Sequence, residues 1–431
     1  MNSREMLVVK GMGGRKTLSG EVTINGAKNA ALPLMASAIL FDGKVDIKKL
    51  PEIRDVIAMR ELLAGLGAEV SQKGKVLSIT PAKKSKGELA PDVAKRLRAS
   101  IILTGPTLAK YGKVVFPHPG GCVLGARPID LFLSAYEKMG ATVEHSGDAY
   151  VIKAPRGGLK GANIFFKTMS MTATEALMFA ATKATGKTVL HNCAMEPEIT
   201  FLADCLNEGG AKIEGAGTPT ITITPTKNLK QKKAFPVLPD RIEAGSFLIL
   251  GALLAKNLTI KNVIPEHLEI VIELLKESGV PITTTKNTIS IKNNIKPNSS
   301  FEPVSFRTHE YPGFPTDLQA PMVVFLTQTK GESTVLETVF DNRFNFVQDL
   351  VRMGARASIW NPHQITVYGP SKLKARHLTG PDIRAGLAYI IAALLAKGTG
   401  TIDNVHLIDR GYADIEGRLS ALGATIERRE A

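Results

Sequence analysis

One cysteine lies in a segment whose composition predicts an exposed loop. The segment runs from Phe116 to Asp130 and contains several prolines and three glycines, which is typical of a loop and not of a core element. A thiol in such a loop is accessible for nucleophilic or acid–base chemistry, and a nearby Arg127 would lower its pKa while a nearby anion would raise it. Cys122 is therefore a candidate catalytic residue. The histidines show no metal-ligand spacing, and only His118, in the same loop, is of interest.

The other two cysteines have a simpler interpretation. Cys193 and Cys205 lie in a strand-like and a helix-like pattern, where cysteine usually acts as a small buried hydrophobic residue. Three cysteines in 431 residues do not suggest a disulfide framework and favour a reducing compartment. The first 14 residues contain no apolar run of the kind found in secretory signals. A cytoplasmic protein is the resulting expectation.

Polar and charged side chains gather where strongly apolar helices are expected to begin. A helix N-terminus has unpaired N–H groups and partial positive charge, so it attracts anions. A lysine or arginine at the same place opposes the helix dipole unless an anion is bound there. The residues concerned are Lys28, Asn29, Arg98, Ser170, Thr172, Asp240, Arg241, Asp317, Asp382 and Arg384.

The acidic and hydroxyl members of this group have a second interpretation. Serine, threonine and aspartate are common N-caps of helices, so capping and chemistry both stay open for Asp317 and Asp382. Capping does not explain Lys28, Arg98 or Arg384. If two domains face each other through these helix ends, the cleft would suit a substrate with several negative charges.

Two turns carry arginine beside turn-forming residues. They are 337–343, which ends in Arg343, and 406–412, which contains Arg410. Each follows an expected strand and precedes an amphipathic helix, as the Cys122 loop does. Arginine suits bidentate contacts to phosphate and carboxylate. Equivalent positions of several repeats thus hold reactive or anion-binding groups.

An internal repeat of about 70 residues organises the chain. An amphipathic helix that closes on glycine and leads into a strand recurs at intervals of 69 to 75 residues. Glycine just after a helix adopts the left-handed conformation that ends it. The repeated glycines are residues 67, 140, 210, 279, 354 and 423.

A second helix in each repeat is apolar nearly all round, which indicates a buried helix. Strand-like runs separate the two helices, so each repeat reads as buried helix, strand, amphipathic helix and two strands. A solenoid is the alternative, but its usual period is shorter. The expected buried helices are 30–40, 100–109, 173–184, 244–254, 318–326 and 385–396.

The sixth repeat is short, and the start of the chain would complete it. The sequence 6–16 resembles 150–160 of the second repeat. This predicts one domain of residues 28–239, with repeats one to three, and a second of residues 1–27 and 240–431, with repeats four to six. We expect an α/β fold with three buried helices inside each domain and strands and amphipathic helices outside.

The composition indicates a folded, basic protein. Hydrophobic residues make up 44%, which excludes a disordered chain, and the formal net charge is +14. Aromatic residues are only 6% and the dense basic runs are short, so nucleic-acid binding is disfavoured. The remaining interpretations of the charge are an ordinary solvated surface and binding of anionic small substrates.

These motifs together resemble those of the enolpyruvyl transferase family, over essentially the whole chain. The similarity is to the members that act on UDP-N-acetylglucosamine. The segments that carry it are 26–33, 98–100, 119–128, 196–198, 238–243, 314–317, 339–344, 382–385 and 408–412. The resemblance implies a two-domain inside-out α/β barrel. It also implies transfer of enolpyruvyl from phosphoenolpyruvate to the sugar 3-hydroxyl with release of phosphate, the first committed step of peptidoglycan synthesis.

The resemblance also implies roles for single residues. Cys122 would be the general acid that protonates the enol carbon, and Asp317 the base for the sugar hydroxyl. Asp382 would position the reacting groups. The groups expected on phosphoenolpyruvate are Lys28, Arg98, Arg127, Arg343, Arg384 and Arg410. Those expected on UDP-N-acetylglucosamine are Asn29, Arg98, Arg127, Ser170, Met171, Thr172, Asp317 and Val339.

The family likeness implies neither cofactor nor metal, and small-molecule substrates without nucleic acid or membrane; a monomer is expected, with an oligomer left open. Four residues depart from the family pattern on the nucleotide side: Ile102, Phe132, Thr172 and Met195. Cysteine at 122 predicts alkylation by fosfomycin. The rival functions are enolpyruvylshikimate phosphate synthase, which shares fold and donor, and an RNA-binding repeat protein.

Overall fold

The computed structural model describes residues 5–118, 129–292, 301–380 and 382–430. Within these ranges the chain forms two compact units. Unit A contains the described residues from 26 to 238, and unit B contains those up to 25 and from 239 onward. The chain therefore passes from unit B into unit A after Asn25 and returns after Leu238.

Unit A contains repeats one to three. Its helices are α1 (Lys28–Ser37), η1 (Ala38–Leu40), α2 (Arg54–Gly65), α3 (Pro91–Arg96), η2 (Arg98–Leu103), α4 (Thr104–Tyr111), α5 (Asp130–Lys138), α6 (Met171–Thr182) and α7 (Pro197–Glu208). Its strands are β3 (Val45–Lys48), β4 (Glu69–Lys73), β5 (Val76–Thr80), β6 (Lys113–Pro117), β7 (Thr142–Ser146), β8 (Ala149–Lys153), β9 (Asn163–Phe165), β10 (Thr188–His191), β11 (Lys212–Glu214), β12 (Thr220–Thr224) and β13 (Phe235–Pro236).

Unit B contains repeats four to six. Its helices are α8 (Arg241–Leu254), η3 (Pro265–Leu268), α9 (Glu269–Glu277), η4 (Thr316–Leu318), α10 (Gln319–Leu326), α11 (Val347–Met353), α12 (Ile383–Leu395), α13 (Val405–Ile408) and α14 (Ile415–Ala421). Its strands are β1 (Glu5–Lys10), β2 (Leu18–Thr23), β14 (Ala255–Lys261), β15 (Ile282–Thr284), β16 (Thr288–Lys292), β17 (Phe306–Arg307), β18 (Gly331–Leu336), β19 (Arg356–Asn361), β20 (Gln364–Gly369), β21 (His377–Thr379), β22 (Thr399–Asp403) and β23 (Thr425–Glu430).

Each repeat forms its own small sheet. In unit A the strand orders are β13-β3-β5-β4, β6-β8-β7 and β11-β12-β10-β9, and in unit B they are β15-β16-β14-β2, β17-β18-β20-β19 and β21-β22-β1-β23. The short edge strands that pair in parallel, such as β9 with β10 and β21 with β22, were missed by the sequence pattern. They are only three residues long, which is too short for a visible alternation.

The N-terminal strand completes the sixth repeat, as the sequence predicted. Strand β1 lies between β22 and β23 and pairs antiparallel with both, with Leu7 opposite Ile402 and Arg428. In the second repeat β8 has the same place between β6 and β7. The side chains of Leu7 and Val9 are fully buried, so the face that packs on the core is set by alternate residues.

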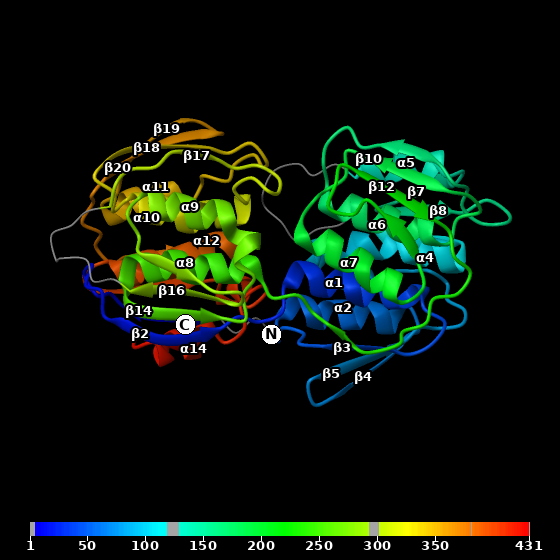
Figure 1. The fold of residues 1–431 in the computed structure, drawn as a ribbon, viewed down its shortest axis with the longest axis horizontal. Helices are drawn as coiled ribbons and strands as arrows, with labels where there is room; N and C mark the ends of the chain where they lie inside the picture. Colours follow the sequence, from blue (N-terminus) through cyan, green and yellow to red (C-terminus); the bar gives the residue numbers. More distant parts are fainter. Residues whose placement is uncertain (1–4, 119–128, 293–300, 381, 431) are drawn as a thin grey trace. The chain divides into compact units, whose positions relative to one another are not determined.

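The inner helices are buried on all sides, and the strands lie outside them. Every residue of α8 and of α10 is buried, and in unit B the helices α8 and α12 lie between β14 and β16 on one side and β18 and β20 on the other (Figure 1). The expected apolar helices are thus confirmed. The fold is the inside-out α/β arrangement, with helices inside and sheets outside.

The second and fifth buried helices differ from the prediction at their starts. Each begins with a 3₁₀ turn, η2 before α4 and η4 before α10. Pro106 and Pro321 lie near the start of these α-helices, and proline has no N–H for the carbonyl four residues earlier. The first turn therefore tightens to the 3₁₀ pattern.

The six predicted helix-ending glycines are confirmed. Gly67, Gly140, Gly210, Gly279, Gly354 and Gly423 all have positive φ, between 86° and 111°. Among the residues described, no helix has both the length and the apolar character needed to cross a membrane.

Candidate active site

In unit B, the Asp317 carboxylate forms ion pairs with two arginines from distant parts of the chain. Arg343 Nη2 donates to Asp317 Oδ1 at 3.0 Å. Arg384 Nε donates to Asp317 Oδ2 at 3.0 Å, and its Nη2 lies 2.9 Å from the same oxygen. Both guanidinium groups are buried, whereas the carboxylate keeps 26% of its side-chain surface exposed. The cluster thus presents a partly open carboxylate backed by two cations.

Capping explains two of the three acidic residues at helix starts. Asp382 accepts from the backbone N–H groups of Arg384 and Ala385, and Asp240 accepts from Ile242 and Glu243. Asp317 lies inside η4, whose N-cap residue is Pro315 and forms no side-chain cap hydrogen bond. The Asp317 carboxylate contacts the side chains of Arg343 and Arg384.

Arg384 is a cation at a helix start whose counter-charge comes from the protein. Burial lowers the pKa of Arg384, but the charge of Asp317, together with Tyr412 and Asp240, holds the pKa above its ordinary value. The guanidinium therefore stays charged inside the unit. This positive group and the start of α12 attract anions together.

A buried glutamate, which the sequence did not single out, ties the Asp317 segment to the turn after β18. Glu337 accepts from Thr316 Oγ1 at 2.9 Å and from the backbone N–H groups of Val339 and Phe340 at 2.9 and 3.0 Å. Thr316 directly precedes Asp317, and the turn leads to Arg343, whose guanidinium lies 5.3 Å from the Phe340 ring.

The turn that carries Arg410 is held by the last strand. Arg428 on β23 donates to both carboxylate oxygens of Asp409, at 3.0 and 2.8 Å, and also contacts Glu5 and Glu416. Arg410 follows Asp409 and is half-buried. The N-terminal and C-terminal strands thus both contribute to the place of a predicted anion-binding residue.

In unit A, Lys28 and Arg98 are the predicted cations. Lys28 is the first residue of α1, and its Nζ lies 3.4 Å from Asp55 Oδ2 in the first turn of α2. Arg98 begins η2 and is half-buried. Asp55 was missed by sequence reasoning, because nothing in its neighbourhood distinguishes it from an exposed acid, although the structure leaves it only 3% exposed.

The residues of unit A that were predicted to bind the nucleotide sugar lie at the starts of α1 and α6. Ser170 caps α6 by accepting from the Ala173 N–H at 3.3 Å, and its hydroxyl lies 3.5 Å from that of Thr172. Met171 and Thr172 are the first residues of α6 and are half-buried, as is Asn29 on α1. Val339, in the turn after β18, belongs to unit B.

Two predicted residues, Cys122 and Arg127, lie outside the described residues. Cys193 and Cys205 are buried, as expected, and burial raises the pKa of each thiol to about 12. Of the four departures from the family pattern, Ile102 and Phe132 are core residues with 2% and 4% exposure, and Met195 is half-buried. Ile102 and Phe132 therefore pack in the core of unit A.

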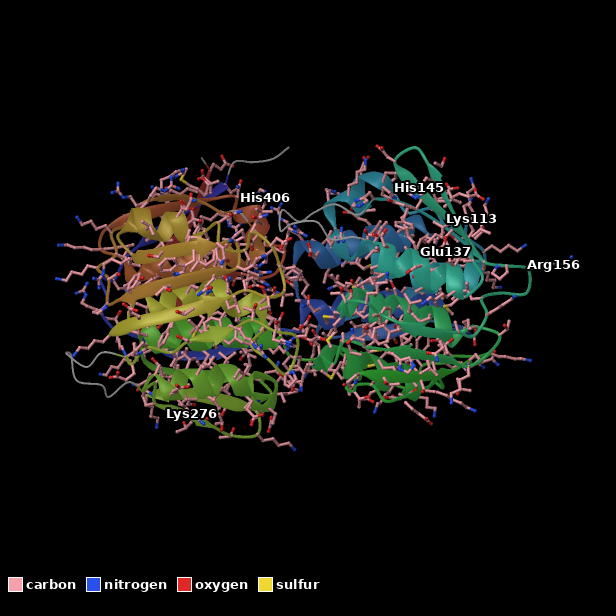
Figure 2. All side chains as sticks on the ribbon, turned by 90° about the horizontal axis from the view of Figure 1, so that it is seen from above. Lys113, Glu137, His145, Arg156, Lys276 and His406 are labelled. Carbon is pink, nitrogen blue, oxygen red and sulfur yellow. The ribbon has the colours of Figure 1, made fainter. Side chains whose placement is uncertain are left out.

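Each unit thus holds lysine or arginine with a carboxylate at the start of an inner helix, which can bind anions and hold a base. Lysines and arginines elsewhere, such as Arg156 and Lys276, are exposed on the outside of their units, as solvated surface charge is (Figure 2). Among the described side chains, no group of three or more histidine, cysteine, aspartate or glutamate residues is placed to hold a metal ion.

Comparison with known proteins identifies the family. The EPSP synthase (3-phosphoshikimate 1-carboxyvinyltransferase) family matches residues 12–419. The chain is 42% identical over 415 residues to the UDP-N-acetylglucosamine 1-carboxyvinyltransferase of Desulfatibacillum aliphaticivorans, which covers 96% of this chain and 98% of that protein. This chain belongs to the family of 1-carboxyvinyltransferases. As a member of that family it is a transferase, and the resemblance read from the motifs is confirmed.

A further relative supports the same family, and two solved structures support the same fold. UDP-N-acetylglucosamine 1-carboxyvinyltransferase 2 of Prochlorococcus marinus is 44% identical and covers 95% of this chain and 96% of its own. The solved enolpyruvyl transferase NikO from Streptomyces tendae has a TM-score of 0.88 over the full length of both chains, at 23% identity. EPSP synthase from Acinetobacter baumannii has a TM-score of 0.73 at 17% identity, covering 99% of this chain and all of its own. At these identities the solved structures support the fold alone.

Proposed function

We propose that this 1-carboxyvinyltransferase moves the enolpyruvyl group of phosphoenolpyruvate to the 3-hydroxyl of UDP-N-acetylglucosamine and releases phosphate. The observation that carries the proposal is the 41–44% identity, over about 96% of the chain, to relatives named for this acceptor. The reaction is a step of peptidoglycan synthesis. We place it in the cytoplasm, with the enzyme acting as a monomer.

The chemistry needs a proton at one carbon and an oxygen at the next. A proton adds to C3 of phosphoenolpyruvate while the sugar 3-hydroxyl forms a bond to C2 and loses its own proton. Phosphate then leaves C2 and a proton leaves C3, which restores the double bond. We assign the general acid to Cys122 and the base to Asp317. The two guanidiniums on Asp317 fix the direction of its carboxylate, so orientation contributes more than basicity.

The remaining residues bind the charges of the substrates. Lys28, Arg127 and Arg410 take the phosphate and carboxylate of phosphoenolpyruvate, with Arg98, Arg343 and Arg384 adding positive charge. Asp382 positions the reacting groups from the start of α12. Asn29, Ser170, Met171, Thr172 and Val339 contact the nucleotide sugar, together with Arg98, Arg127 and Asp317. The N–H groups at the starts of α1 and α6 support the same anions.

The test is phosphate release with two acceptors. Purified protein with phosphoenolpyruvate and UDP-N-acetylglucosamine should release phosphate and form the enolpyruvyl ether, identified by mass spectrometry. Shikimate 3-phosphate in place of the nucleotide sugar should give no release. Turnover with shikimate 3-phosphate alone would assign the sister activity instead, and turnover with neither acceptor would overturn the proposal.

A matched pair of variants tests the base. Asp317→Asn keeps the shape of the side chain and removes its charge, so kcat should fall about 10²- to 10⁴-fold. Asp341→Asn changes an exposed aspartate in the turn between Phe340 and Arg343 and should retain nearly full activity. Equal activities of the two variants would remove Asp317 from the mechanism.

A further inference from the structure

A buried tyrosine holds the arginine that faces Asp317. Tyr412 has 1% of its surface exposed, and Arg384 Nη1 donates to its hydroxyl at 3.2 Å. The guanidinium carbon of Arg384 also lies 5.6 Å from the centre of the Tyr412 ring. The phenol thus contacts the side of the guanidinium that does not contact the carboxylate.

Each of the two hydroxyls, of Tyr412 and of Ser246, donates one hydrogen bond and accepts another. Ser246 Oγ donates to the carbonyl of Ile242 at 2.7 Å, so its oxygen is left to accept. The Tyr412 hydroxyl lies 3.4 Å from Ser246 Oγ and donates to it, which leaves the phenol oxygen to accept from Arg384. Burial raises the pKa of the Tyr412 phenol against the opposing charge of Arg384, so the phenol keeps the proton that it donates. Chains of this kind strengthen each bond through polarisation.

Close packing at two glycines brings these groups together. A Cβ on Gly411 would lie 2.8 Å from Ile383 Cγ2 and 3.7 Å from Arg384 Nη1, so only glycine lets the turn before Tyr412 approach the start of α12. A Cβ on Gly245 would lie 2.4 Å from Leu318 Cδ1, so glycine also lets α8, with Ser246, approach the turn that carries Asp317. Three elements meet here with little room for a different arginine conformation.

Arginine needs such support because its side chain has many rotamers. Ordering a rotamer-rich side chain costs conformational entropy, and a base must be held in a precise place relative to the atom that it deprotonates. With Nε and Nη2 on Asp317 and Nη1 on Tyr412, three of the nitrogen atoms of Arg384 have fixed partners. Neither Tyr412 nor Ser246 contacts the carboxylate itself.

We propose that Tyr412, supported by Ser246, is a positioning residue for catalysis, which holds Arg384 so that the Asp317 carboxylate is aimed at the acceptor hydroxyl. This inference rests on the proposed function. It assigns a task to a residue of the 408–412 motif that the family resemblance left without one.

The decisive variant is Tyr412→Phe, which keeps the ring and removes only the hydroxyl. Its kcat for enolpyruvyl transfer should fall about 10-fold and its KM for phosphoenolpyruvate should rise about 3-fold, while the KM for UDP-N-acetylglucosamine changes less than 2-fold. A defect of packing alone would lower the amount of active enzyme and leave both KM values unchanged. The matched control is Tyr389→Phe on α12, whose buried hydroxyl bonds to Asp349 and not to the arginine cluster. This control should stay within 2-fold of the wild type in all three constants.

A double-mutant cycle tests whether Tyr412 acts through Arg384. Arg384→Gln should be strongly impaired, and adding Tyr412→Phe to it should change kcat/KM by less than 2-fold, because the contact is already lost. Multiplicative effects of the two substitutions would overturn the proposal, and so would a Tyr412→Phe enzyme that matches Tyr389→Phe.

A second variant covers the case in which Tyr412→Phe does not fold. Ser246→Ala removes the acceptor of the phenol proton and should lower kcat about 2- to 5-fold with the same change in KM; unchanged constants would again contradict the proposal. If the wild-type enzyme itself does not turn over the substrate pair, the proposed function fails. If the wild type is active and Tyr412→Phe has the same kcat and KM values as Tyr389→Phe, only this inference fails.

Discussion

At the scale of single residues, the cations at helix starts are neutralised by acids of the protein. Lys28 faces Asp55 and Arg384 faces Asp317, each within one compact unit. The sequence argument required an anion at these places, and the protein's own carboxylates supply one. A phosphate or carboxylate of a substrate then competes with an internal partner that is already in place. If Asp317 is the proposed base, binding of such an anion and release of Asp317 are coupled.

Thiol reactivity gives a prediction for one residue. Cys193 and Cys205 form thiolate only near pH 12, so at pH 7.5 about one thiol in 10⁴ is ionised at each site, and both are buried. The native protein should therefore take up one equivalent of iodoacetamide at pH 7.5, and Cys122→Ala should take up none. Fosfomycin should inactivate the wild-type enzyme in parallel with modification of Cys122.

Peptide mapping by mass spectrometry shows which cysteines iodoacetamide and fosfomycin have modified. Labelling of Cys193 or Cys205 in the native protein, or inactivation by the epoxide without a modified Cys122, would contradict this assignment. Unfolded protein, in which all three thiols should react, is the positive control.

At the scale of elements, the site depends on connections between segments and not on any helix alone. Glu337 accepts three hydrogen bonds that join the turn after β18 to the residue before Asp317. Because a carboxylate only accepts, its replacement by an amide turns a donor toward either the Thr316 hydroxyl or the backbone N–H groups of Val339 and Phe340. Leaving such a buried group unsatisfied costs about 1–3 kcal/mol.

Glu337→Gln should therefore lower kcat about 10-fold and Tm by about 2–6 °C. The control is Glu332→Gln on β18, the strand that precedes Glu337, where the side chain is exposed. Steady-state kinetics and thermal unfolding measure the two effects. A Glu337→Gln enzyme with wild-type kcat would show that this connection does not position the site.

Inner helix α6 offers a prediction on pH. Burial, and then the charges of Glu198 and Glu196, raise the pKa of Glu175 well above its usual range. The folded protein keeps a proton here that the unfolded chain releases, so stability falls as pH rises from the ordinary carboxyl range through the raised pKa. Glu175→Gln, which resembles the protonated form, should remove that fall.

The Tm advantage of Glu175→Gln over the wild type should be about 2–4 °C larger at pH 8 than at pH 5, which corresponds to about 1 kcal/mol. Glu137→Gln, on the exposed face of outer helix α5 (Figure 2), should show no such dependence on pH. A constant difference in Tm for Glu175→Gln across this range would mean that the group is ionised in the folded protein.

At the scale of the whole molecule, the chain passes from unit B into unit A and back. Within each unit, the two residues next to these crossings lie close together. Asp240 N–H donates to the Asn25 carbonyl at 2.9 Å within unit B, and Ala27 N–H donates to the Leu238 carbonyl at 2.6 Å within unit A. Each unit also has its own inner helices and three sheets. Unit A is therefore one insertion between two neighbouring residues of unit B.

This connectivity predicts that two fragments fold on their own. Residues 26–238 alone, and residues 1–25 joined to 239–431 through two glycines, should each unfold in a single cooperative thermal transition. Neither alone should release phosphate, because the proposed acid and the proposed base lie in different fragments. Circular dichroism and calorimetry check folding. Fragments without a cooperative transition would show that the units are not independent.

Whether a feature of the fold or site could be predicted from the sequence depends on how far apart along the chain the residues that form it lie. The six repeats, their buried helices, the glycines that end the outer helices and the completion of repeat six by the N-terminal strand all follow from local periodicity, and the structure confirms them. The family and its transferase activity also followed from the motifs. The three-residue parallel strands were missed, because a pattern of that length carries no periodic signal.

Only the tertiary structure decided which charges meet. Arg343 and Arg384 reach Asp317 across 26 and 67 residues of chain, and Lys28 reaches Asp55 across 27. A short motif reports the type of a residue and the start of its helix, but contacts across such distances depend on how helices pack and where glycine allows close approach. For that reason the sequence alone did not show that the Asp317 carboxylate pairs with Arg343 and Arg384, whereas the packing of unit B brings these three side chains together.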